Sequence, residues 1–457
     1  MRTSNRNKSV IGWLFLVVVL WNINSGRVCG QQSLPVSVRL EKGPPGTTIS
    51  LHPVEPFKVR LDVIPGHGEG SVVIYIELAR RGRGYWLPEF VIVTDQQGRP
   101  IPVRHPALEW YRMWITVPAK KASYYPQAVR PKMGHFRPRY PRENERTVQD
   151  AASGFKASIC TWYDGRRAAL SLRFDDSHPT HLSKVIPYLR QYGFKGTFMI
   201  NPGNSDYLEH KTEWEIVARQ GDMEFANHTM HHRGARNDEE MEHEIGDAAL
   251  YIQSLFPNKS KLIALNLGGG TWWTTTKPLR YYLDKYSLFD AMSGSLSMDD
   301  NYGHRVEAFK RHLERNIERG GWCRVHFHSI GKGFSTSEEH FRAILDIVKA
   351  HEHKLWIAGV ADAYKYLQER RASKLEIVNI SQSSVKLKLT CLTDSTLYDQ
   401  PLTLEVTCPR SWSTEKVRVT DAEGNILPTR RVSTATGVVL RFDVPPVTAS
   451  YTIRCGE

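Results

Sequence analysis

The sequence has no Cys-x-x-Cys pair, no internal repeat and no low-complexity tract. These absences give no support to a cysteine-based metal site, a repeat architecture or a chain that is largely disordered. The apolar share of 40% is ordinary for globular proteins. A chain of 457 residues therefore predicts two or three folded domains.

An apolar run from Val10 to Trp21 lies near the N-terminus and follows three basic residues. It is short for a helix that spans a membrane. Val28 and Gly30 come after a polar stretch and fit a signal-peptidase site, so residues 1–30 are predicted to be a removable secretory signal. We therefore expect a protein that is secreted, periplasmic or on the cell surface, without stable membrane insertion after cleavage. An uncleaved membrane anchor is the alternative.

The formal net charge of the chain is +13 at pH 7. Cleavage after residue 30 would remove four basic residues and lower this charge to +9. Outside the cytoplasm, such basicity favours an acidic glycan or a cell-surface polymer as partner and argues against nucleic acid. A surface that is merely charged and soluble is an equal explanation.

Cleavage would also remove Cys29 and leave an odd number of cysteines, which excludes complete intramolecular pairing. One disulfide among the last three cysteines and buried free thiols are equal alternatives. The cysteines that remain are Cys160, Cys323, Cys391, Cys408 and Cys455.

Three hydrophobic patterns divide the rest of the chain. Residues 31–150 carry β-branched runs broken by Gly and Pro, which predict an N-terminal β-sandwich with a basic, Pro-rich linker over residues 130–146. Residues 156–371 alternate strands with amphipathic helices and predict an α/β fold, a parallel (β/α)7 barrel. Residues 372–457 predict a C-terminal β-sandwich. The expected barrel strands begin near Ala168, Gly196, Met223, Leu262, Leu288, Trp322 and Leu355.

Acidic and histidine side chains follow two of the barrel strands. Asp175 and Asp176 end the first strand, and His228 and His232 follow the third. Barrel enzymes place their chemistry at this carboxyl-terminal rim. One carboxylate and two imidazoles suit Zn²⁺ and leave a coordination position for water, with Asp175 as a spare carboxylate. His231 competes with His232 for the ligand role, and an ordinary surface helix face is the other explanation of the histidine pair.

The same residues carry a family resemblance. Phe174-Asp175-Asp176 followed by His228-Thr229-x-x-His232 resembles the first two motifs of the polysaccharide deacetylases, the NodB-homology carbohydrate esterases of family 4. The resemblance extends over roughly residues 158–371 and implies a distorted barrel. A later segment, Trp322 to Ser329, resembles the last motif of the family.

The resemblance also implies a role for each motif residue. Asp175 would be the catalytic base and His328 the general acid. Asp176, His228 and His232 would bind a divalent metal ion, most simply Zn²⁺, with Co²⁺ or Ni²⁺ as alternatives. The implied reaction is the removal of acetyl groups from an N- or O-acetylated polysaccharide, an acidic one included, by a metal-activated water.

Two motifs of the family are altered in this chain. The third normally reads Arg-x-Pro-aromatic, whereas residues 266–273 contain neither Arg nor Pro. The fourth, an Asp followed by an Asp-Trp pair, has its nearest counterpart at Asp290. These changes leave open a catalytically inactive relative that binds glycan in the same groove. A metal-dependent amidase that acts on a non-carbohydrate substrate is a second alternative.

Four residues are candidates for substrate binding: Asn266, Gly269, Trp272 and Asp290. Asn266 could orient Asp175 through a hydrogen bond in place of the missing Arg. Gly269 lies in a glycine loop whose backbone N–H can approach an oxyanion closely, although an ordinary tight turn is an equal interpretation. Trp272 offers an aromatic face for a sugar ring, and core packing is the common alternative.

Overall fold

The computed structural model describes residues 34–79, 86–129, 140–331, 333, 335–434 and 437–456. The predicted signal, residues 1–30, lies outside the described residues, as does most of the predicted linker. The end of that linker, Glu143–Arg146, forms a short 3₁₀ helix.

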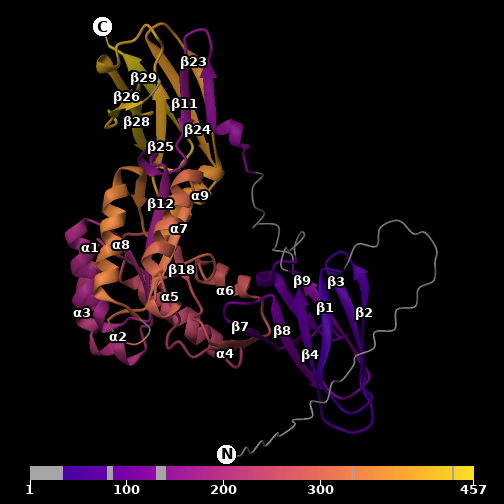
Figure 1. Cartoon of the computed structure of the whole chain (residues 1–457). Coiled ribbons are helices and arrows are strands. Elements are labelled where there is room, and N and C mark those ends of the chain that lie inside the picture. Colours follow the sequence, from indigo (N-terminus) through magenta and orange to yellow (C-terminus); the bar gives the residue numbers. More distant parts are fainter. Residues whose placement is uncertain are drawn as a thin grey trace, which may run out of the picture. The chain divides into compact units, whose positions relative to one another are not determined.

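The centre of the chain forms a curled sheet of parallel strands (Figure 1). All seven strands predicted for the barrel are present, together with a two-residue strand, β18. The sheet order is β17 (Leu288–Asp290), β15 (Ile263–Leu265), β14 (Glu224–Asn227), β13 (Gly196–Ile200), β12 (Ala168–Asp175), β19 (Trp322–Phe327) and β18 (Leu296–Ser297), and β22 (Leu355–Ile357) pairs with β12.

The sheet does not close into the (β/α)7 barrel that the strand count predicts. In the part of the chain that the structure describes, β17 pairs only with β15 and β18 pairs only with β19. Both edge strands are short, with three and two residues, so they offer few backbone groups to each other. The result is a half-barrel rather than a closed one.

Helices follow most of the strands of the half-barrel, as the alternating pattern predicts. Gly193, with a φ of 74°, ends the first of them in the left-handed region that favours glycine. The helices are α1 (Ile186–Tyr192), α2 (Ser205–Glu209), α3 (Lys211–Gln220), α4 (Asp238–Met241), α5 (Ala248–Ser254), α6 (Leu279–Lys285), α7 (Arg305–Arg319), α8 (Glu338–His351) and α9 (Val360–Arg371).

Residues before the half-barrel form two antiparallel sheets around one buried core. A strand from the half-barrel region, β16 (Trp272–Thr275), extends the first sheet by pairing with β7. The first sheet contains β1 (Val36–Lys42), β4 (Ser71–Leu78), β8 (Arg112–Pro118), β7 (Val103–Pro106) and β16. The second contains β2 (Thr48–Glu55), β3 (Lys58–Ile64), β9 (Ala122–Ala128), β5 (Val91–Thr94) and β6 (Pro100–Ile101).

The C-terminal region also forms two antiparallel sheets with a shared core. One contains β10 (Thr147–Asp150), β11 (Phe155–Ile159), β25 (Leu402–Thr407), β28 (Gly437–Val444) and β27 (Arg430–Thr434). The other contains β23 (Ser373–Ile380), β24 (Ser384–Cys391), β29 (Ala449–Cys455) and β26 (Val417–Thr420).

The predicted boundaries at residues 150 and 156 do not coincide with these sheets. Strands β10 and β11 precede the half-barrel in sequence, but β11 pairs with β25, which follows it. Strand β10 pairs with β11, and the second partner of β11 is separated from it by the whole half-barrel, so local patterning could not assign the two strands to the C-terminal region.

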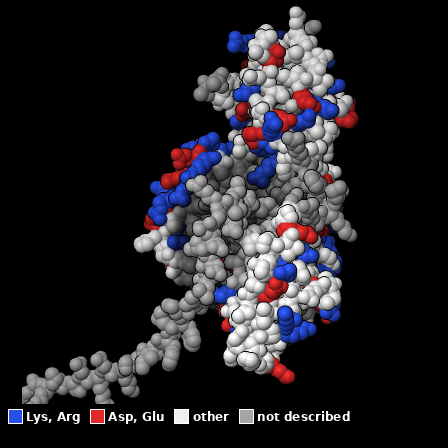
Figure 2. All heavy atoms as spheres, turned by 90° about the vertical axis from the view of Figure 1, so that its right-hand side faces the viewer, with Lys and Arg blue, Asp and Glu red and all other residues white. Residues whose placement is uncertain are grey.

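The described cysteines, Cys160, Cys323, Cys391, Cys408 and Cys455, are free thiols. Among the described residues, no helix has both the length and the apolar character needed to cross a bilayer. Figure 2 shows basic side chains interspersed with acidic ones on the face that it draws. The net positive charge is therefore not gathered into a single basic patch on that face.

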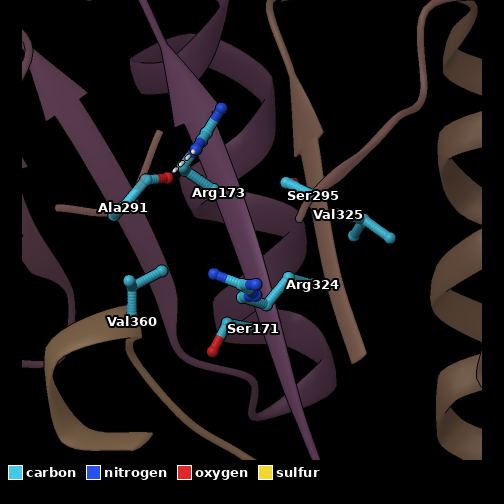
Figure 3. Close-up of a pocket in the computed structure, with 7 residues that line it drawn as sticks. All are labelled: Ser171, Arg173, Ala291, Ser295, Arg324, Val325 and Val360. Carbon is cyan, nitrogen blue, oxygen red and sulfur yellow. Dashed lines mark hydrogen bonds between the residues drawn. The ribbon is translucent and has the colours of Figure 1, made fainter. Parts of the chain in front are cut away.

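Polar residues alternate with apolar ones along β12 and β19, as expected for strands with two different faces. Ser171 and Arg173 of β12 and Arg324 of β19 line a pocket on the inner face of the half-barrel (Figure 3). The volume of this pocket, about 10 Å³, has room for roughly one water molecule. The inner face is therefore polar close to the carboxyl ends of the strands.

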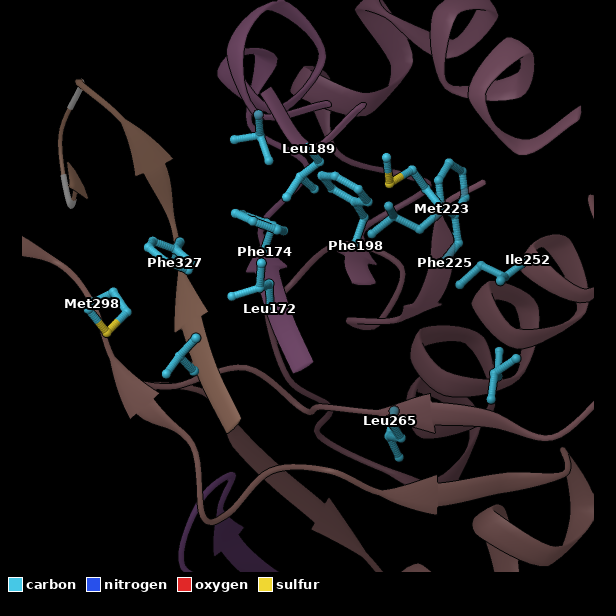
Figure 4. Close-up of a cluster of buried hydrophobic side chains, with 14 of the residues drawn as sticks. Leu172, Phe174, Leu189, Phe198, Met223, Phe225, Ile252, Leu265, Met298 and Phe327 are labelled. Atoms are coloured by element: carbon cyan, nitrogen blue, oxygen red, sulfur yellow. The ribbon is translucent and has the colours of Figure 1, made fainter. Parts of the chain in front are cut away.

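The other face of the half-barrel is a packed hydrophobic core (Figure 4). Phe174 lies at its centre, stacked against Phe198 and Phe327 with ring centroids 5.1 Å away on each side. Leu172 and Leu189 belong to the same core. This packing fixes β12 in its register, and Asp175 and Asp176 follow immediately after it.

Candidate metal centre and its acid–base groups

Asp176, His228 and His232 lie together at the carboxyl ends of β12 and β14. One ligand atom from each residue lies within 4.8 Å of the others. Oδ1 of Asp176 is 3.0 Å from Nε2 of His228 and 3.6 Å from Nε2 of His232. The three residues predicted as metal ligands are therefore brought together, and the set consists of one carboxylate and two imidazoles.

The loops that carry these residues adopt an unusual backbone. Asp176, Ser177, Thr229 and His232 have φ values of 76°, 55°, 68° and 57°. Non-glycine residues seldom occupy this region, and such conformations concentrate at functional sites. The side chain of Asn201 supports one of the loops by donating hydrogen bonds to the carbonyl oxygens of His228 and Thr229. The histidine motif is thus a tight loop and not a helical turn.

Hydrogen bonds orient the two imidazoles. Nδ1 of His228 donates a hydrogen bond to the carbonyl oxygen of Asn266 at 2.9 Å. Its other ring nitrogen, Nε2, faces Asp176 and is the atom that could bind an ion. The ring of His232 lies against Gly268, where a Cβ atom would come within 2.2 Å of Nε2. Glycine at 268, with a φ of +81°, therefore makes room for this ring.

His231 does not join the cluster. Its Nδ1 lies 2.8 Å from Oε1 of Glu244, a buried carboxylate, and its backbone N–H donates to the same side chain. The sequence left both His231 and His232 as candidates for the ligand role. The pairing of His231 with Glu244 leaves His232 as the one that belongs to the cluster. The donor set of Asp176, His228 and His232 fits a divalent ion such as Zn²⁺ and leaves further coordination positions for water or substrate.

Asp175 is buried, with 3% of its surface exposed. Nη2 of Arg173 donates to its Oδ2 at 2.9 Å, and Nδ2 of Asn266 lies 3.4 Å from the same oxygen. Burial raises the pKa of Asp175, but the charges of Arg173, His228 and His326 outweigh burial and hold it below its ordinary value. The carboxylate is therefore ionised, and its Oδ1 has no hydrogen-bond partner among the described residues.

Arg173 is a functional candidate that the motif comparison missed. It occupies the position two residues before Asp175, so both side chains lie on the same face of β12. Its Nη1 also donates to the carbonyl oxygen of Ala291 at 3.0 Å, as Figure 3 shows. The signal in the sequence was an arginine inside a strand, two positions before Asp175, that is buried along its whole length.

His328 forms a pair with a second buried carboxylate. Its Nδ1 lies 2.7 Å from Oδ2 of Asp299, and its Nε2 is 3.9 Å from Oδ2 of Asp176. Burial lowers the pKa of His328, but the hydrogen bond to Asp299 and the charges of Asp175 and Asp176 outweigh burial and raise it. Nε2 can therefore carry a proton close to the metal cluster.

Asp299, and not Asp290, is the carboxylate that lies beside His328. Asp299 is fully buried, whereas Asp290 is exposed and accepts a hydrogen bond from the backbone N–H of Met292. The short strand β18 separates the two positions and brings Asp299 beside His328. Nothing in the described contacts links Asp290 to the metal cluster.

The other predicted substrate-binding residues have different surroundings. Asn266 is buried and contacts Asp175, as predicted. Gly269 is exposed in the loop that follows Asn266. Trp272 is 40% exposed but belongs to β16, where the guanidinium of Arg104 lies over its ring at 4.1 Å. One face of Trp272 is thus already covered by a neighbouring side chain.

Residues 163–281 match the sequence model of the family described as polysaccharide deacetylase. A gellan lyase from Bacillus sp is 22% identical over 294 residues, which span 56% of this chain and 12% of that protein. The chain thus corresponds to only a small part of this curated relative.

Two solved structures are similar to part of the chain. The chitin deacetylase of the fungus Colletotrichum lindemuthianum aligns with a TM-score of 0.34 and 14% identity, over 43% of this chain and 87% of that one. A family 4 carbohydrate esterase from Streptomyces lividans aligns with a TM-score of 0.32 and 18% identity, over 42% and 91%. These scores are too low to support a conclusion on function.

The matched segment includes Asp175, Asp176, His228 and His232 and ends before Asp299 and His328. It therefore contains both motifs on which the sequence comparison rested. The predicted resemblance is confirmed: residues 163–281 of this chain match the polysaccharide deacetylase family.

Proposed function

We propose that this protein is an exported, metal-dependent deacetylase that removes acetyl groups from an N- or O-acetylated polysaccharide. One observation carries the proposal. The cluster of Asp176, His228 and His232 has a buried carboxylate, Asp175, directly before it in the chain and a protonatable imidazole, His328, at 3.9 Å from Asp176. A metal site, a base and an acid in one place are the requirements of metal-assisted hydrolysis.

Asp176, His228 and His232 would hold the ion, which we propose to be Zn²⁺, with Co²⁺ or Ni²⁺ as alternatives. When bound, the ion would polarise the acetyl carbonyl and make a water molecule more acidic. Its positive charge would also favour the ionised forms of Asp175 and Asp176. Asn266, which orients both His228 and Asp175, would hold the ligand and the base in a fixed relation.

The chain's own groups would move the proton. Asp175 would accept it from the attacking water through Oδ1, because Arg173 and Asn266 already occupy Oδ2. His328 would then donate a proton from Nε2 to the leaving amine or hydroxyl, since its Nδ1 is bonded to Asp299. The altered third and fourth motifs thus have substitutes in Arg173 and Asp299.

These substitutes favour an enzyme over an inactive glycan-binding relative. Without Arg173 and Asp299, the base and the acid would lack the charged partners that set their protonation states. Both partners are buried and make close contacts, so they are not incidental surface charges. The exposed carboxylate of Asp290 plays no part in this argument.

The test is acetate release from a panel of N- and O-acetylated polysaccharides, measured on the intact protein and on Asp175→Asn together with its metal content. We expect the intact protein to release acetate and the variant to keep its metal but lose activity by about 10²-fold or more. Bound metal without acetate from any glycan would favour the inactive glycan binder. Activity on small amides but not on sugars would favour the amidase.

Export has its own measurement. We propose that the signal predicted over residues 1–30 is removed, so the mature protein recovered from outside the cytoplasm should begin near Gln31. Mass spectrometry of the N-terminal peptide determines this directly. An intact N-terminus on a membrane-bound protein would favour the anchor instead.

A further inference from the structure

A row of five side chains crosses the first N-terminal sheet, with one residue from each strand. Arg39 of β1 pairs in register with Tyr75 of β4, Tyr75 with Trp114 of β8, and Trp114 with Arg104 of β7. Trp272 of β16 completes the row, because the guanidinium of Arg104 lies over its ring. Five strands at a spacing of about 4.8 Å make this row roughly 19 Å long.

The members of the row contact one another continuously. The guanidinium of Arg39 lies 4.9 Å from the centre of the Tyr75 ring, and the rings of Tyr75 and Trp114 are 4.9 Å apart. Trp114 meets Trp272 edge to face at 5.4 Å. Basic and aromatic side chains thus form one strip, which we call the aromatic strip: Arg39, Tyr75, Trp114, Arg104 and Trp272.

The aromatic strip faces away from the core of its sheet. The neighbouring residues on the same strands, such as Ile74, Ile76, Met113 and Ile115, are fully buried on the opposite face. Within the strip, Arg39 and Arg104 are exposed and Trp272 is 40% exposed. Tyr75 and Trp114 are half-buried, so the strip is a contiguous, partly exposed aromatic surface rather than a single exposed side chain.

Among the described residues, the guanidinium of Arg104 is the member of the strip that has no acidic partner. Arg39 is paired with Glu41, and the nearby Arg112 is paired with Glu109. Arg104 forms no ion pair with any acidic residue in the ranges described, and its partner is the ring of Trp272. Glu77, opposite Arg112, is the remaining acidic side chain of these strands. A carboxylate on a ligand can therefore bind Arg104 without displacing another one.

The aromatic strip ends beside the loop that carries His232. Trp272 follows the glycine loop whose Gly268 lies against the ring of His232. Gly234, two residues after His232, packs so closely on the backbone of Trp272 that a Cβ atom there would meet its carbonyl oxygen at 2.2 Å. Ala235 and Trp272 then share a backbone hydrogen bond of 3.1 Å. The loop that carries His232 and the end of the strip are one continuous piece of structure.

We infer that the aromatic strip binds a segment of an acidic polysaccharide and leads that chain to the metal centre. The parts of the aromatic rings that the arginines leave uncovered pack against the apolar C–H groups of successive sugar rings, and Arg104 binds a sugar carboxylate through charge-assisted hydrogen bonds. A neutral glycan uses the rings but gains nothing from Arg104. This inference deepens the proposed function, on which its second half rests, by naming the class of substrate and the surface that holds it.

Binding is measured separately from catalysis, so the two ideas can fail independently. The probes are hyaluronan as the acidic acetylated polysaccharide, glycol chitin as the neutral one, and single-stranded oligo(dT). Affinity is compared in the full-length protein for the wild type, Trp114→Ala, Arg104→Gln and Arg104→Lys. Tyr281→Ala is the matched control, because Tyr281 is 39% exposed and has Lys277 at 4.3 Å over its ring, but lies outside the strip.

We expect hyaluronan to bind more tightly than glycol chitin. Trp114→Ala and Arg104→Gln should each weaken hyaluronan binding by about fivefold or more, and Tyr281→Ala should leave it unchanged. Arg104→Lys should recover part of the loss, because it keeps the charge. Circular dichroism and the melting temperature exclude unfolding as the cause of a loss.

Equal affinities for the two glycans, or strip variants that bind like the wild type, would overturn the inference. Tighter binding of oligo(dT) than of hyaluronan would overturn it in favour of a nucleic-acid surface. Binding that depends on the strip, in a protein that releases no acetate, would leave the strip established and remove the proposed deacetylase activity instead.

Discussion

Arg173 and Asp175 form a buried ion pair within one strand, with Nη2 of the arginine 2.9 Å from Oδ2 of the carboxylate. In this chain, where the third motif has Asn266 and no arginine, Arg173 supplies a guanidinium beside Asp175 from two positions upstream. Together with the charges of His228 and His326, this pair accounts for an ionised Asp175 in a buried place.

The first prediction concerns this pair. Arg173→Met should lower kcat/KM for deacetylation by about 10²-fold or more, because the proposed base loses the charge that keeps it ionised. In the folded protein, the charge of Arg173 holds down the pKa of Asp175. Removing this charge should raise that pKa and move the acid limb of the pH–rate profile to higher pH. The loss of one partner of a buried pair should also destabilise the protein by about 3–5 kcal/mol.

The control for this variant is Arg324→Gln. Arg324 lines the same pocket as Arg173. Among the described residues, however, it makes no hydrogen bond with Asp175. Arg173→Lys should restore part of the activity, since it retains a positive charge. An acid limb that stays in place in Arg173→Met would show that Arg173 does not set the protonation of the base.

The second prediction separates Asp299 from Asp290. In Asp299→Asn, the pKa of His328 should fall, because its largest stabilising partner loses its charge. A general acid works only while it is protonated, so the alkaline limb of the pH–rate profile should move to lower pH and kcat should fall by about 10²-fold. Asp290→Asn, the variant that the motif comparison alone would choose, should leave both the limb and kcat unchanged. If Asp290→Asn moved the alkaline limb and lowered kcat while Asp299→Asn did neither, Asp290 and not Asp299 would be the residue that sets the protonation of His328.

The cluster of Asp176, His228 and His232 and the strands of the half-barrel could be predicted because their signals are local. Asp175 and Asp176 are adjacent, His228 and His232 lie four positions apart, and each strand is a short apolar run. The gathering of these side chains then needs only the rule that parallel strands end at one rim.

Three features depend on contacts that no local pattern contains. Asp299 reaches His328 only because β18 lies alongside β19. Trp272 lies in a sheet of the N-terminal region because β16 pairs with β7, from a distant part of the chain. In the same way, β11 pairs with β25 across the whole half-barrel. Backbone hydrogen bonds between distant strands carry little sequence specificity, so register and partner are decided by the packing of the complete fold.

The third prediction tests the ligand set. His228→Ala should lower the affinity for Zn²⁺ by at least about 100-fold and abolish turnover, because it removes one of the nitrogen donors. His231→Ala should keep the stoichiometric metal, since its imidazole is paired with Glu244. Metal content by atomic emission after dialysis is the measurement. A His231 variant that loses its metal while the His228 variant retains it would reverse the assignment of the two residues.

The last prediction concerns stability away from the site, at Glu369 of α9. This carboxyl group is fully buried; one oxygen accepts a hydrogen bond of 2.8 Å from the backbone of Gln400, and the other has no partner among the described residues. Burial, with a smaller contribution from Asp399, raises its pKa from 4.5 to about 8. The folded chain therefore keeps this proton over a range of pH in which the unfolded chain has released it.

The sign of the effect follows from proton linkage. Because the unfolded state binds fewer protons than the folded state between pH 4.5 and about 8, the free energy of unfolding should fall as the pH rises through this range. Glu369→Gln keeps the acceptor for Gln400 and removes the titration, so it should stabilise the protein above pH 8 by up to about 5 kcal/mol and flatten the pH dependence. Denaturant unfolding at pH 5, 7 and 9 measures this, with the exposed Glu423→Gln as control. If the two variants have the same pH dependence as the wild type, Glu369 is ionised in the folded protein, and the carboxyl group must have a partner that compensates its charge.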